Sequence, residues 1–497
     1  MNMTENKRLN IKTISQLFKF YSSSGDKITT SSNINHSSIN NNSLKKVLLE
    51  WSSKSSAHGF PGLSSKNSNY IIRIVWIILM LTSWSYCFYT IIKTLIKFFE
   101  YGCDTNIDYI NETPFPFPAI DICNLSPTGF NLLSPEVEDI WLRNLNYVNQ
   151  NADYQLYQQI IQNLEGIYGN RNELEKHHEA IADALRFYEY FYDENKELFD
   201  KIPHNLSLIL FNCSFRNKKC TVNDFKKYRN YFYGNCFRFN WDLNDLKMVN
   251  RPGLKYGLRL ELFTGFDGLN TDSDGFKILI NNQSFQGYPE ENGFDISPGF
   301  QTNIAISRTF IKNLDWPYNQ CLDNLINSKY SYLIKNNEIL QKMISNGQVD
   351  HDENLCFKLC YQKYITDSCS CYDLSQPQYY YKSFNGCYYL PDKYCSIISD
   401  MNFFQTKAAE ECVKKCPDRC TKFVYDSTIS FSKYPSEWYL NNYVNDSLMK
   451  GNYSKFFSLV NIYFNEMPYK MVHQKETIDL ESLLGYIGGQ LGIILIS

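Results

Sequence analysis

Nineteen residues at positions 74–92 read IVWIILMLTSWSYCFYTII and contain no charged side chain. Arg73 precedes this stretch and Lys93 follows it. At a helical rise of about 1.5 Å per residue the stretch extends roughly 28 Å, which is close to the hydrocarbon thickness of a bilayer. A buried helix of a soluble protein is rarely apolar on every face with a charge at each end. The sequence therefore predicts a transmembrane helix.

Charge is distributed unevenly about this helix. Ten of the 49 Lys and Arg residues, but only three of the 52 Asp and Glu residues, lie at or before Arg73. The first segment thus has a net charge of about +7 and the remainder about −10. Lys and Arg accumulate on the cytoplasmic side of membrane helices, so we expect a cytoplasmic N-terminus. No early basic segment leads into a short apolar core, so a cleaved signal peptide is not expected.

Most of the sixteen cysteines lie beyond the apolar stretch. Their clustering predicts an oxidising compartment and a disulfide framework, and a zinc site is disfavoured because close histidine partners are lacking. Asn-x-Ser/Thr triplets fit the same compartment, although such triplets arise often by chance in an Asn-rich chain. They begin at Asn111, Asn124, Asn205, Asn212, Asn282, Asn445 and Asn452. We expect N-linked glycans at all of these except Asn124.

The rest of the chain has the pattern of a large folded body. Its mean hydropathy of −0.39 argues against a transporter with many membrane helices. Alternating apolar residues at 256–263 (YGLRLELF) and 276–280 (FKILI) predict strands, and good helix formers at 134–200 predict helices. Residues 1–50, rich in Ser, Asn and Lys, predict a mobile cytoplasmic tail.

The last fifteen residues, 483–497, read LLGYIGGQLGIILIS and are too few to span a bilayer alone. Either a second membrane helix is cut short here or the segment is merely amphiphilic. We favour the incomplete helix, which places both chain ends in the cytoplasm. Four glycines in it suit tight helix packing or a pore in which helices approach closely, and a simple anchor needs none of them. They are Gly485, Gly488, Gly489 and Gly492.

The sequence does not favour an enzyme. It contains no glycine-rich phosphate loop, no HExxH and no GxSxG motif, and its seven histidines are scattered. We therefore expect no catalytic residue, cofactor, metal or nucleic-acid partner. A membrane-anchored binding or adhesion ectodomain is the competing class, from which the glycine-rich second apolar segment distinguishes a pore.

Four segments, in this order, resemble the degenerin/epithelial sodium channel family, which includes the acid-sensing channels. Together they extend the resemblance over roughly residues 55–497. They are His58-Gly59 in SSAHGFPGL, FPFPAIDICNLSP at 115–127, GFKILINNQSFQGYPEENGFDISPGFQTNIAIS at 275–307, and LLGYIGGQLG at 483–492.

This resemblance implies an α+β membrane protein. Two transmembrane helices would flank a large disulfide-rich extracellular domain with a β-sheet palm and a helical finger and thumb. The implied segments are a cytoplasmic tail at 1–54, a pre-membrane His-Gly segment at 55–69, the first transmembrane helix at 70–95, the ectodomain at 96–479 (finger about 124–235, thumb about 321–420), and the start of the second helix at 480–497.

The spacing of Cys356 and Cys360, i and i+4, puts both thiols on one face of a helix, but spacing cannot give connectivity. The resemblance implies the pairs, five of which form a nested ladder that would stiffen the thumb. Cys87 is an ordinary thiol within the membrane span, and Cys103 has no assigned partner. The implied pairs are Cys123–Cys236, Cys213–Cys220, Cys321–Cys420, Cys356–Cys416, Cys360–Cys412, Cys369–Cys395 and Cys371–Cys387.

The resemblance also implies a function: a subunit of a trimeric, extracellularly gated, amiloride-sensitive sodium-type cation channel in the plasma membrane. It would form homo- or heterotrimers with related subunits, conduct sodium ions and contact membrane lipid. The alternative is a non-conducting accessory subunit or the anchored binding ectodomain named above.

Particular positions inherit roles from this resemblance. Gly485 occupies the position where bulky side chains hold such channels open, and Gly492 the pore-facing position that contributes to amiloride block. The narrow Gly-x-Ser filter should begin near residue 496, where Ile496 replaces the expected glycine and Ser497 follows. Tyr486 stands where many relatives carry an acidic residue.

His58 and Gly59 would lie in a re-entrant segment that lines the lower pore, where we favour a structural role for His58 over a titrating one. The His-Val-Thr signature of acid-sensing relatives is missing, since residues 109–117 read YINETPFPF. Furin sites of the Arg-x-x-Arg form are absent too, and residues 216–219 are only basic. Peptide gating and mechanical gating remain, and we favour an extracellular ligand, with a peptide as the candidate.

Overall fold

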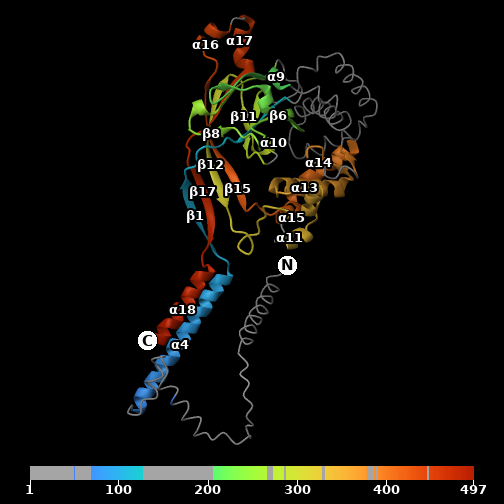
Figure 1. Ribbon diagram of the computed structural model, residues 1–497. Coiled ribbons are helices and arrows are strands. Elements are labelled where there is room, and N and C mark those ends of the chain that lie inside the picture. The colour runs from blue at the N-terminus through green and yellow to red at the C-terminus, as the bar shows by residue number, and fades with distance from the viewer. Residues whose placement is uncertain are drawn as a thin grey trace. The chain divides into compact units, whose positions relative to one another are not determined.

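The computed structural model describes residues 50, 69–126, 205–265, 273–284, 287–326, 331–377, 384–387, 390–444 and 447–496. The chain divides into two compact units (Figure 1). One combines Met1–Ile96 with Leu480–Ser497, and the other is Lys97–Asp479. We describe each unit by itself.

The first unit contains two apolar helices, α4 (Tyr70–Phe99) and α18 (Leu480–Ile496). Within the described ranges, α4 is the one helix that is long and apolar enough to cross a membrane, which confirms the helix predicted at 74–92 and extends it at both ends. Helix α18 has 17 residues. Thr90 on α4 donates a hydrogen bond from Oγ1 to Gln490 Oε1 of α18 at 3.2 Å, so a polar contact joins the two helices.

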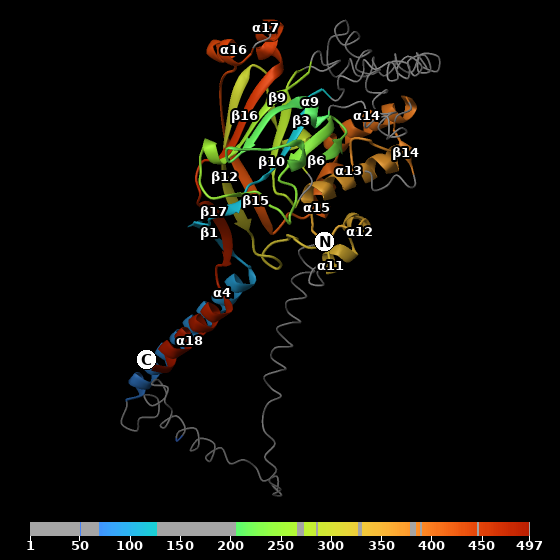
Figure 2. The same ribbon diagram turned by 45° about the horizontal axis from the view of Figure 1, so that its top comes forward.

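The second unit is built on an eight-stranded sheet (Figures 1 and 2). Its order is β1-β17-β12-β16-β9-β4-β5, and β15 pairs with β12 off this path. The strands are β1 (Cys103–Ile110), β4 (Leu210–Phe215), β5 (Lys218–Lys219), β9 (Leu258–Phe263), β12 (Phe300–Lys312), β15 (Thr421–Lys433), β16 (Phe457–Phe464) and β17 (Tyr469–Glu476).

Hydrophobic pattern decides where each strand lies in this sheet. β16 reads FSLVNIYF, is buried along nearly its whole length and lies in the interior between β12 and β9. β12 alternates between buried and half-buried residues. β1 pairs antiparallel with β17 over eight residues, from Cys103 opposite Glu476 to Ile110 opposite Tyr469.

A five-stranded sheet packs against the first, in the order β11-β10-β3-β7-β6. One apolar core draws on both sheets and includes Phe117, Phe239, Leu260 and Phe464. The strands are β3 (Ala119–Asn124), β6 (Phe225–Asn230), β7 (Gly234–Phe239), β10 (Phe276–Asn281) and β11 (Phe294–Ile296). Two short pairs complete the unit: β2 (Phe115–Pro116) with β8 (Met248–Val249), and β13 (Cys371–Tyr372) with β14 (Asn385–Gly386).

A helical lobe lies beside the sheets (Figure 2). Its central helix begins after Asp352, whose carboxylate accepts hydrogen bonds from the amides of Asn354 and Leu355 at 3.0 and 3.1 Å. Phe403 is fully buried at the centre of the lobe. The helices are α11 (Ser331–Lys335), α12 (Glu338–Ser345), α13 (Glu353–Cys369), α14 (Leu390–Gln405) and α15 (Lys407–Lys415).

A buried carboxylate fixes two further helices, α16 (Glu437–Tyr443) and α17 (Ser447–Phe456), to the large sheet. Glu261 on β9 accepts hydrogen bonds from the hydroxyls of Tyr434, Tyr439 and Tyr453. Short helical turns occur at α9 (Leu206–Ile209), η2 (Val222–Asp224), η3 (Leu254–Tyr256) and α10 (Pro289–Asn292).

Both strands predicted from the sequence are present, and they differ from the prediction only at their ends. The stretch at 256–263 forms β9 from Leu258 onward, because η3 occupies the preceding residues, and the stretch at 276–280 forms β10. The segment 275–307 contributes to both sheets, through β10 and β11 in one and β12 in the other. The tail expected at 1–50 lies outside the described residues except for residue 50, and the helices expected at 134–200 lie outside them entirely.

Candidate functional site

Seven disulfides shape the second unit, and they are the same seven pairs that the family resemblance implied. Cys356 and Cys360 both lie on α13 and bond to Cys416 and Cys412, so two rungs join α13 to the α15 region. The other pairs are Cys123–Cys236, Cys213–Cys220, Cys321–Cys420, Cys369–Cys395 and Cys371–Cys387. Cys87 and Cys103 are free thiols.

A cleft of about 550 Å³ opens between the helical lobe and the β6–β7 turn. Phe232 lies on the turn, Phe357 on α13 and Phe404 on α14, so three elements supply aromatic walls. Glu291, Asp373 and Asp400 supply carboxylates. We call this hollow the lobe cleft.

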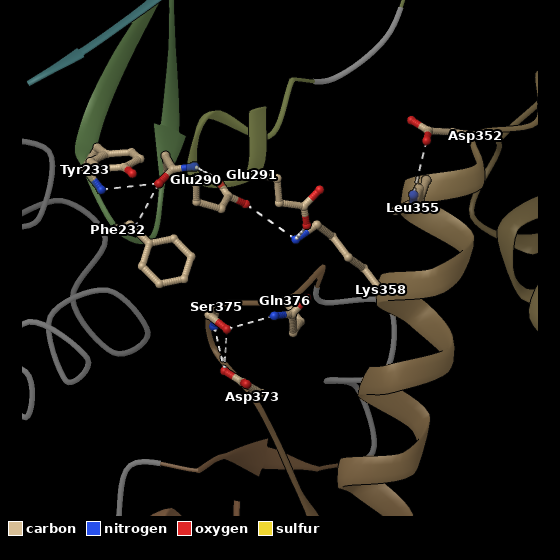
Figure 3. Close-up of polar contacts among 11 residues, drawn as sticks. Phe232, Tyr233, Glu290, Glu291, Asp352, Leu355, Lys358, Asp373, Ser375 and Gln376 are labelled. Carbon is tan, nitrogen blue, oxygen red and sulfur yellow. Dashed lines mark hydrogen bonds and ion pairs between the residues drawn. The ribbon is translucent and has the colours of Figure 1, made fainter. Parts of the chain in front are cut away.

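Lys358 crosses the upper edge of the lobe cleft from α13 to α10 (Figure 3). Its Nζ lies 2.6 Å from Glu291 Oε1 and 3.5 Å from Glu290 Oε1, and 4.6 Å from the centre of the Tyr288 ring. Only 9% of the Lys358 side chain is exposed. A cation buried to this degree requires such partners, so this ion pair ties the helical lobe to the sheets.

Asn230 extends this contact to the β6–β7 turn. Its Nδ2 donates to Glu290 Oε2 at 3.1 Å, while its Oδ1 accepts from the amides of Phe232 and Tyr233 at 2.8 and 3.2 Å. Burial, with Glu290 nearby, raises the pKa of Tyr233 to about 12, so this hydroxyl stays neutral at physiological pH. The turn, α10 and α13 therefore share one polar network.

The lobe cleft combines aromatic surface with an excess of carboxylates. Among its lining residues Lys358 is the one cation, and two carboxylates already engage it. Asp400 accepts a hydrogen bond from Tyr361 Oη at 2.8 Å, and Asp373 Oδ1 accepts from Ser375 Oγ at 2.8 Å, as Figure 3 shows for the second pair. Aromatic faces and carboxylates together favour a cationic ligand with apolar groups.

The four predicted pore glycines all lie on α18. Gly485 and Gly489 are four residues apart and share a helix face, with Gly492 one turn further along. Leaving aside the adjacent residues and the backbone of α18 itself, a Cβ added at any of the four would meet no atom of the described residues within 4 Å. Nothing in the described chain therefore packs against these glycines, and Tyr486 beside them is 57% exposed.

Other predicted site residues differ in their surroundings. His58, Gly59, Asn445 and Ser497 lie outside the described residues. Asn111, Asn205 and Asn212 are exposed, whereas Asn282 and Asn452 are half-buried. Asn124, whose triplet was not taken as a glycosylation site, is 2% exposed, and its Nδ2 donates to the Thr264 carbonyl at 2.9 Å, so it is not accessible to a glycan.

Comparison with known proteins assigns the chain, with its disulfide-rich unit and its two apolar helices, to a family. The amiloride-sensitive sodium channel family matches residues 51–495, which is most of the chain. The chain belongs to this family. Members are ion channels of the plasma membrane and not enzymes, which confirms both the family resemblance and the expectation of a non-enzyme.

Three curated relatives illustrate the range of the family. The alpha subunit of the epithelial sodium channel from Xenopus laevis is 22% identical over 90% of this chain and 78% of its own length. Acid-sensing ion channel 1 from Gallus gallus is 24% identical over 90% and 80%. Degenerin deg-1 from Caenorhabditis elegans is 26% identical over 56% and 36%. A solved proton-activated chloride channel overlaps 85% of this chain and 92% of its own at 8% identity and a TM-score of 0.32, which is too weak to support a conclusion.

Sequence reasoning missed the lobe cleft. Lys358 and Glu290 are 68 positions apart, and although Glu290 lies in the family-resembling segment 275–307, nothing in that segment points to Lys358 as its partner. The cysteine spacing gave no signal either, because Lys358 lies two residues from both Cys356 and Cys360 and therefore on the opposite face of α13 from the two disulfides.

Proposed function

We propose that this chain is a subunit of a trimeric, extracellularly gated, amiloride-sensitive sodium-type cation channel. On this proposal α4 and α18 are its two membrane helices, residues 96–479 form the ectodomain, and the N-terminus is cytoplasmic. The large sheet would serve as the palm, residues of about 124–235 as the finger, and the helical lobe as the thumb.

The glycine face of α18 is the observation that carries this proposal. Four glycines in one apolar helix cost helix stability, and within the described chain nothing packs against them. Three such faces meeting at a threefold axis would allow close helix approach and would expose backbone carbonyls to ions. Related subunits and lipid would then cover the surface of α18 that is exposed in this chain alone.

Replacement of Gly485 by Phe in the full-length subunit tests the pore. Three aromatic rings would crowd the axis where closed helices converge, and overpacking typically costs about 1–3 kcal/mol per site. Even about 2 kcal/mol shifts a two-state equilibrium roughly thirtyfold. Two-electrode recording, alone and with related subunits, should show a constitutive, cation-selective current that amiloride blocks.

Ile487→Phe is the matched control, because position 487 lies about 200° around the helix from Gly485. It should leave the channel closed at rest. If Gly485→Phe reaches the surface, assembles with its partners and remains silent, a non-conducting accessory or adhesion role becomes the better interpretation.

We further propose the lobe cleft as the site of an extracellular peptide with a basic and an aromatic side chain. Its aromatic walls and its surplus of carboxylates support this ligand class. Recording across a peptide panel should identify an agonist, and Asp373→Asn with Asp400→Asn should weaken its potency. Loss of maximal current with unchanged potency would instead place the two residues in gating.

Surface topology has its own test. N-glycosidase treatment should lower the apparent mass of surface protein in which Asn111, Asn205 and Asn212 are intact, and Gln at all three should abolish most of that shift. Unmodified asparagines in surface protein would contradict an extracellular location for residues 96–479.

A further inference from the structure

A second hollow, with lining residues that the lobe cleft does not share, adjoins the β4–β5 hairpin. Its volume is about 420 Å³, which lies within the range of small-ligand pockets. The hairpin and η2 form one side, and residues 246–248 form another. We call it the hairpin pocket.

Four cations line the hairpin pocket: Arg216, Lys218, Lys219 and Lys247. Asp224 is the one carboxylate among the lining residues, and both its oxygens are already engaged. Its Oδ2 accepts from the Thr221 amide at 2.9 Å, and its Oδ1 lies 3.3 Å from Lys247 Nζ. The pocket therefore has an excess of three positive charges.

Lys218 and Lys219 supply most of that excess. Both are exposed, and in the part of the chain that the structure describes neither forms an ion pair. This contrasts with the remainder of the chain beyond Arg73, where acidic residues outnumber basic ones by ten. A local concentration of unneutralised cations in such a chain favours an anion at this pocket.

The hairpin fixes the backbone that carries Lys218 and Lys219. The Cys213–Cys220 disulfide closes it, and Phe215 pairs with Lys218 in the ladder. Arg216 and Asn217 form its two-residue turn with φ of 53° and 58°, the left-handed region that costs most residues about 1–2 kcal/mol. Arg216 Nη1 donates to the Met248 carbonyl at 3.1 Å, which anchors the guanidinium at the rim.

Apolar side chains form the remaining wall. Phe215, Leu246 and Met248 are half-buried and line the same hollow. A cationic rim beside an apolar wall matches a ligand that has both an anionic head and an apolar body. An inorganic ion would leave the apolar wall in contact with water, and an extended polyanion would not fit inside a pocket of this volume.

We propose that the hairpin pocket binds a small amphipathic anion, with a sulfate, sulfonate, phosphate or carboxylate group against Lys218 and Lys219 and an apolar body against Phe215 and Met248. This site is separate from the pore and from the lobe cleft, and it does not depend on the chain conducting ions.

Calorimetric titration of the full chain in detergent micelles tests this site, with naphthalene-2-sulfonate as the probe. Naphthalene-2-sulfonamide, which is neutral, and inorganic sulfate serve as comparison ligands. The sulfonate should bind at least about tenfold more tightly than either, because a charge-assisted hydrogen bond and apolar contact act together only in it. Comparable affinity for the sulfonamide or for sulfate would contradict the proposal.

The double substitution Lys218→Gln, Lys219→Gln should weaken sulfonate binding by roughly tenfold or more. Lys226→Gln with Lys227→Gln is the matched control, since it removes the same charge from two exposed lysines of β6 that do not line the pocket. The control should change the affinity by no more than about twofold. Equal losses in the two double variants would reduce the effect to diffuse electrostatics, and no binding by the unmodified chain would overturn the proposal outright.

Lys219→Glu provides a variant with one substitution. Reversal of a single exposed charge leaves the hairpin disulfide intact and should abolish detectable binding, whereas Lys227→Glu should not. Retained binding in Lys219→Glu would exclude the assigned position of the anionic head.

Discussion

The two sheets and the helical lobe are stabilised in different ways. The sheets share an apolar core that includes Phe117, Phe239 and Phe464, and only two of the seven disulfides lie there. The lobe has a smaller core around Phe403 and contains the other five disulfides. The larger region relies mainly on burial of apolar surface, whereas the smaller one has many more covalent links for its size. The lobe should therefore respond more strongly to changes at single positions.

Phe403→Ala is expected to have the largest effect. Phe403 is fully buried, and its ring lies 5.0 Å from that of Tyr361. Truncation of a buried Phe to Ala typically costs about 3–5 kcal/mol. Amide hydrogen exchange should show the opening free energy of α13 falling by this amount, while that of β12 stays unchanged. Phe404→Ala, at a residue 64% exposed, is the control and should change exchange little. Equal loss of protection in β12 would show that lobe and sheets open together.

Removal of the two disulfides between α13 and the α15 region should have the second-largest effect. Replacement of Cys356, Cys416, Cys360 and Cys412 by Ala should lower the stability of the lobe by about 2–4 kcal/mol, because the unfolded chain regains freedom. Thermal melting followed by limited proteolysis would detect cleavage within 353–415 at lower temperature.

Cys213→Ala with Cys220→Ala is the comparison for the rung removal, since these residues are separated by only seven positions. It should affect the sheets less, because a short loop has little entropy to regain. An equal or larger effect would contradict the contrast between the two regions.

Lys358→Met should have a smaller effect on the contact between the regions. It leaves Glu290 and Glu291 facing an apolar side chain, and partial exposure of these carboxylates limits the cost to about 1–2 kcal/mol. Hydrogen exchange at α10 and the β6–β7 turn should increase. Lys363→Met is the control, because Lys363 pairs with Asp367 on the surface of the same helix.

A double-mutant cycle sharpens this measurement. Adding Glu290→Gln and Glu291→Gln to Lys358→Met should recover part of the lost protection, because no unpaired charge then remains. If the combined variant loses as much as the sum of its parts, the ion pair does not couple lobe and sheets.

The smallest expected effect is on the acid stability of the lobe. Burial lowers the pKa of His351, despite the hydrogen bond to the Pro417 carbonyl, and Asp352, Glu353 and Arg419 are the charged groups nearby. The unfolded state, with a histidine pKa of about 6.5, therefore takes up the proton first. Stability that is fully present above this pH should decline as the pH falls toward the lowered pKa.

His351→Gln should reduce this loss of unfolding free energy between pH 7.5 and 5 by less than about 1 kcal/mol. The readout is the melting temperature of the chain at each pH, which should fall less steeply with acid in the variant. Glutamine can still donate to the Pro417 carbonyl but does not titrate. An unchanged pH slope in the variant would assign the decline to other groups.

Local pattern predicted much of the fold. The uncharged, largely apolar stretch at 74–92 was sufficient to predict α4, and alternation of apolar residues was sufficient to predict β9 and β10. The seven pairs came from the family resemblance, because spacing alone allows many connectivities. The lobe cleft could not be predicted, since it brings together side chains from elements far apart in sequence. The hairpin pocket is lined by residues within 215–248, but its shape depends on how the hairpin folds against η2 and residues 246–248. Tertiary contacts also hide a local motif: the triplet at Asn124 suggests a surface site, but the Asn124 side chain is buried and donates a hydrogen bond to the Thr264 carbonyl.

The pairing of β1 with β17 has a mechanical consequence. Three residues separate the end of α4 from the start of β1, and three separate the end of β17 from the start of α18. Cys103 lies opposite Glu476, and Thr477 N donates to Gly102 O at 3.0 Å. The segments that lead to α4 and to α18 thus both leave from the same end of the hydrogen-bonded ribbon that β1 and β17 form. Sliding β1 along β17 would break the hydrogen-bonded pairing of eight residues, whereas bending or twisting the ribbon displaces both strands together. A force applied to the end of the ribbon near Cys103 and Glu476 is therefore transmitted as a shared rotation or tilt of β1 and β17, and not as a sliding of one strand past the other.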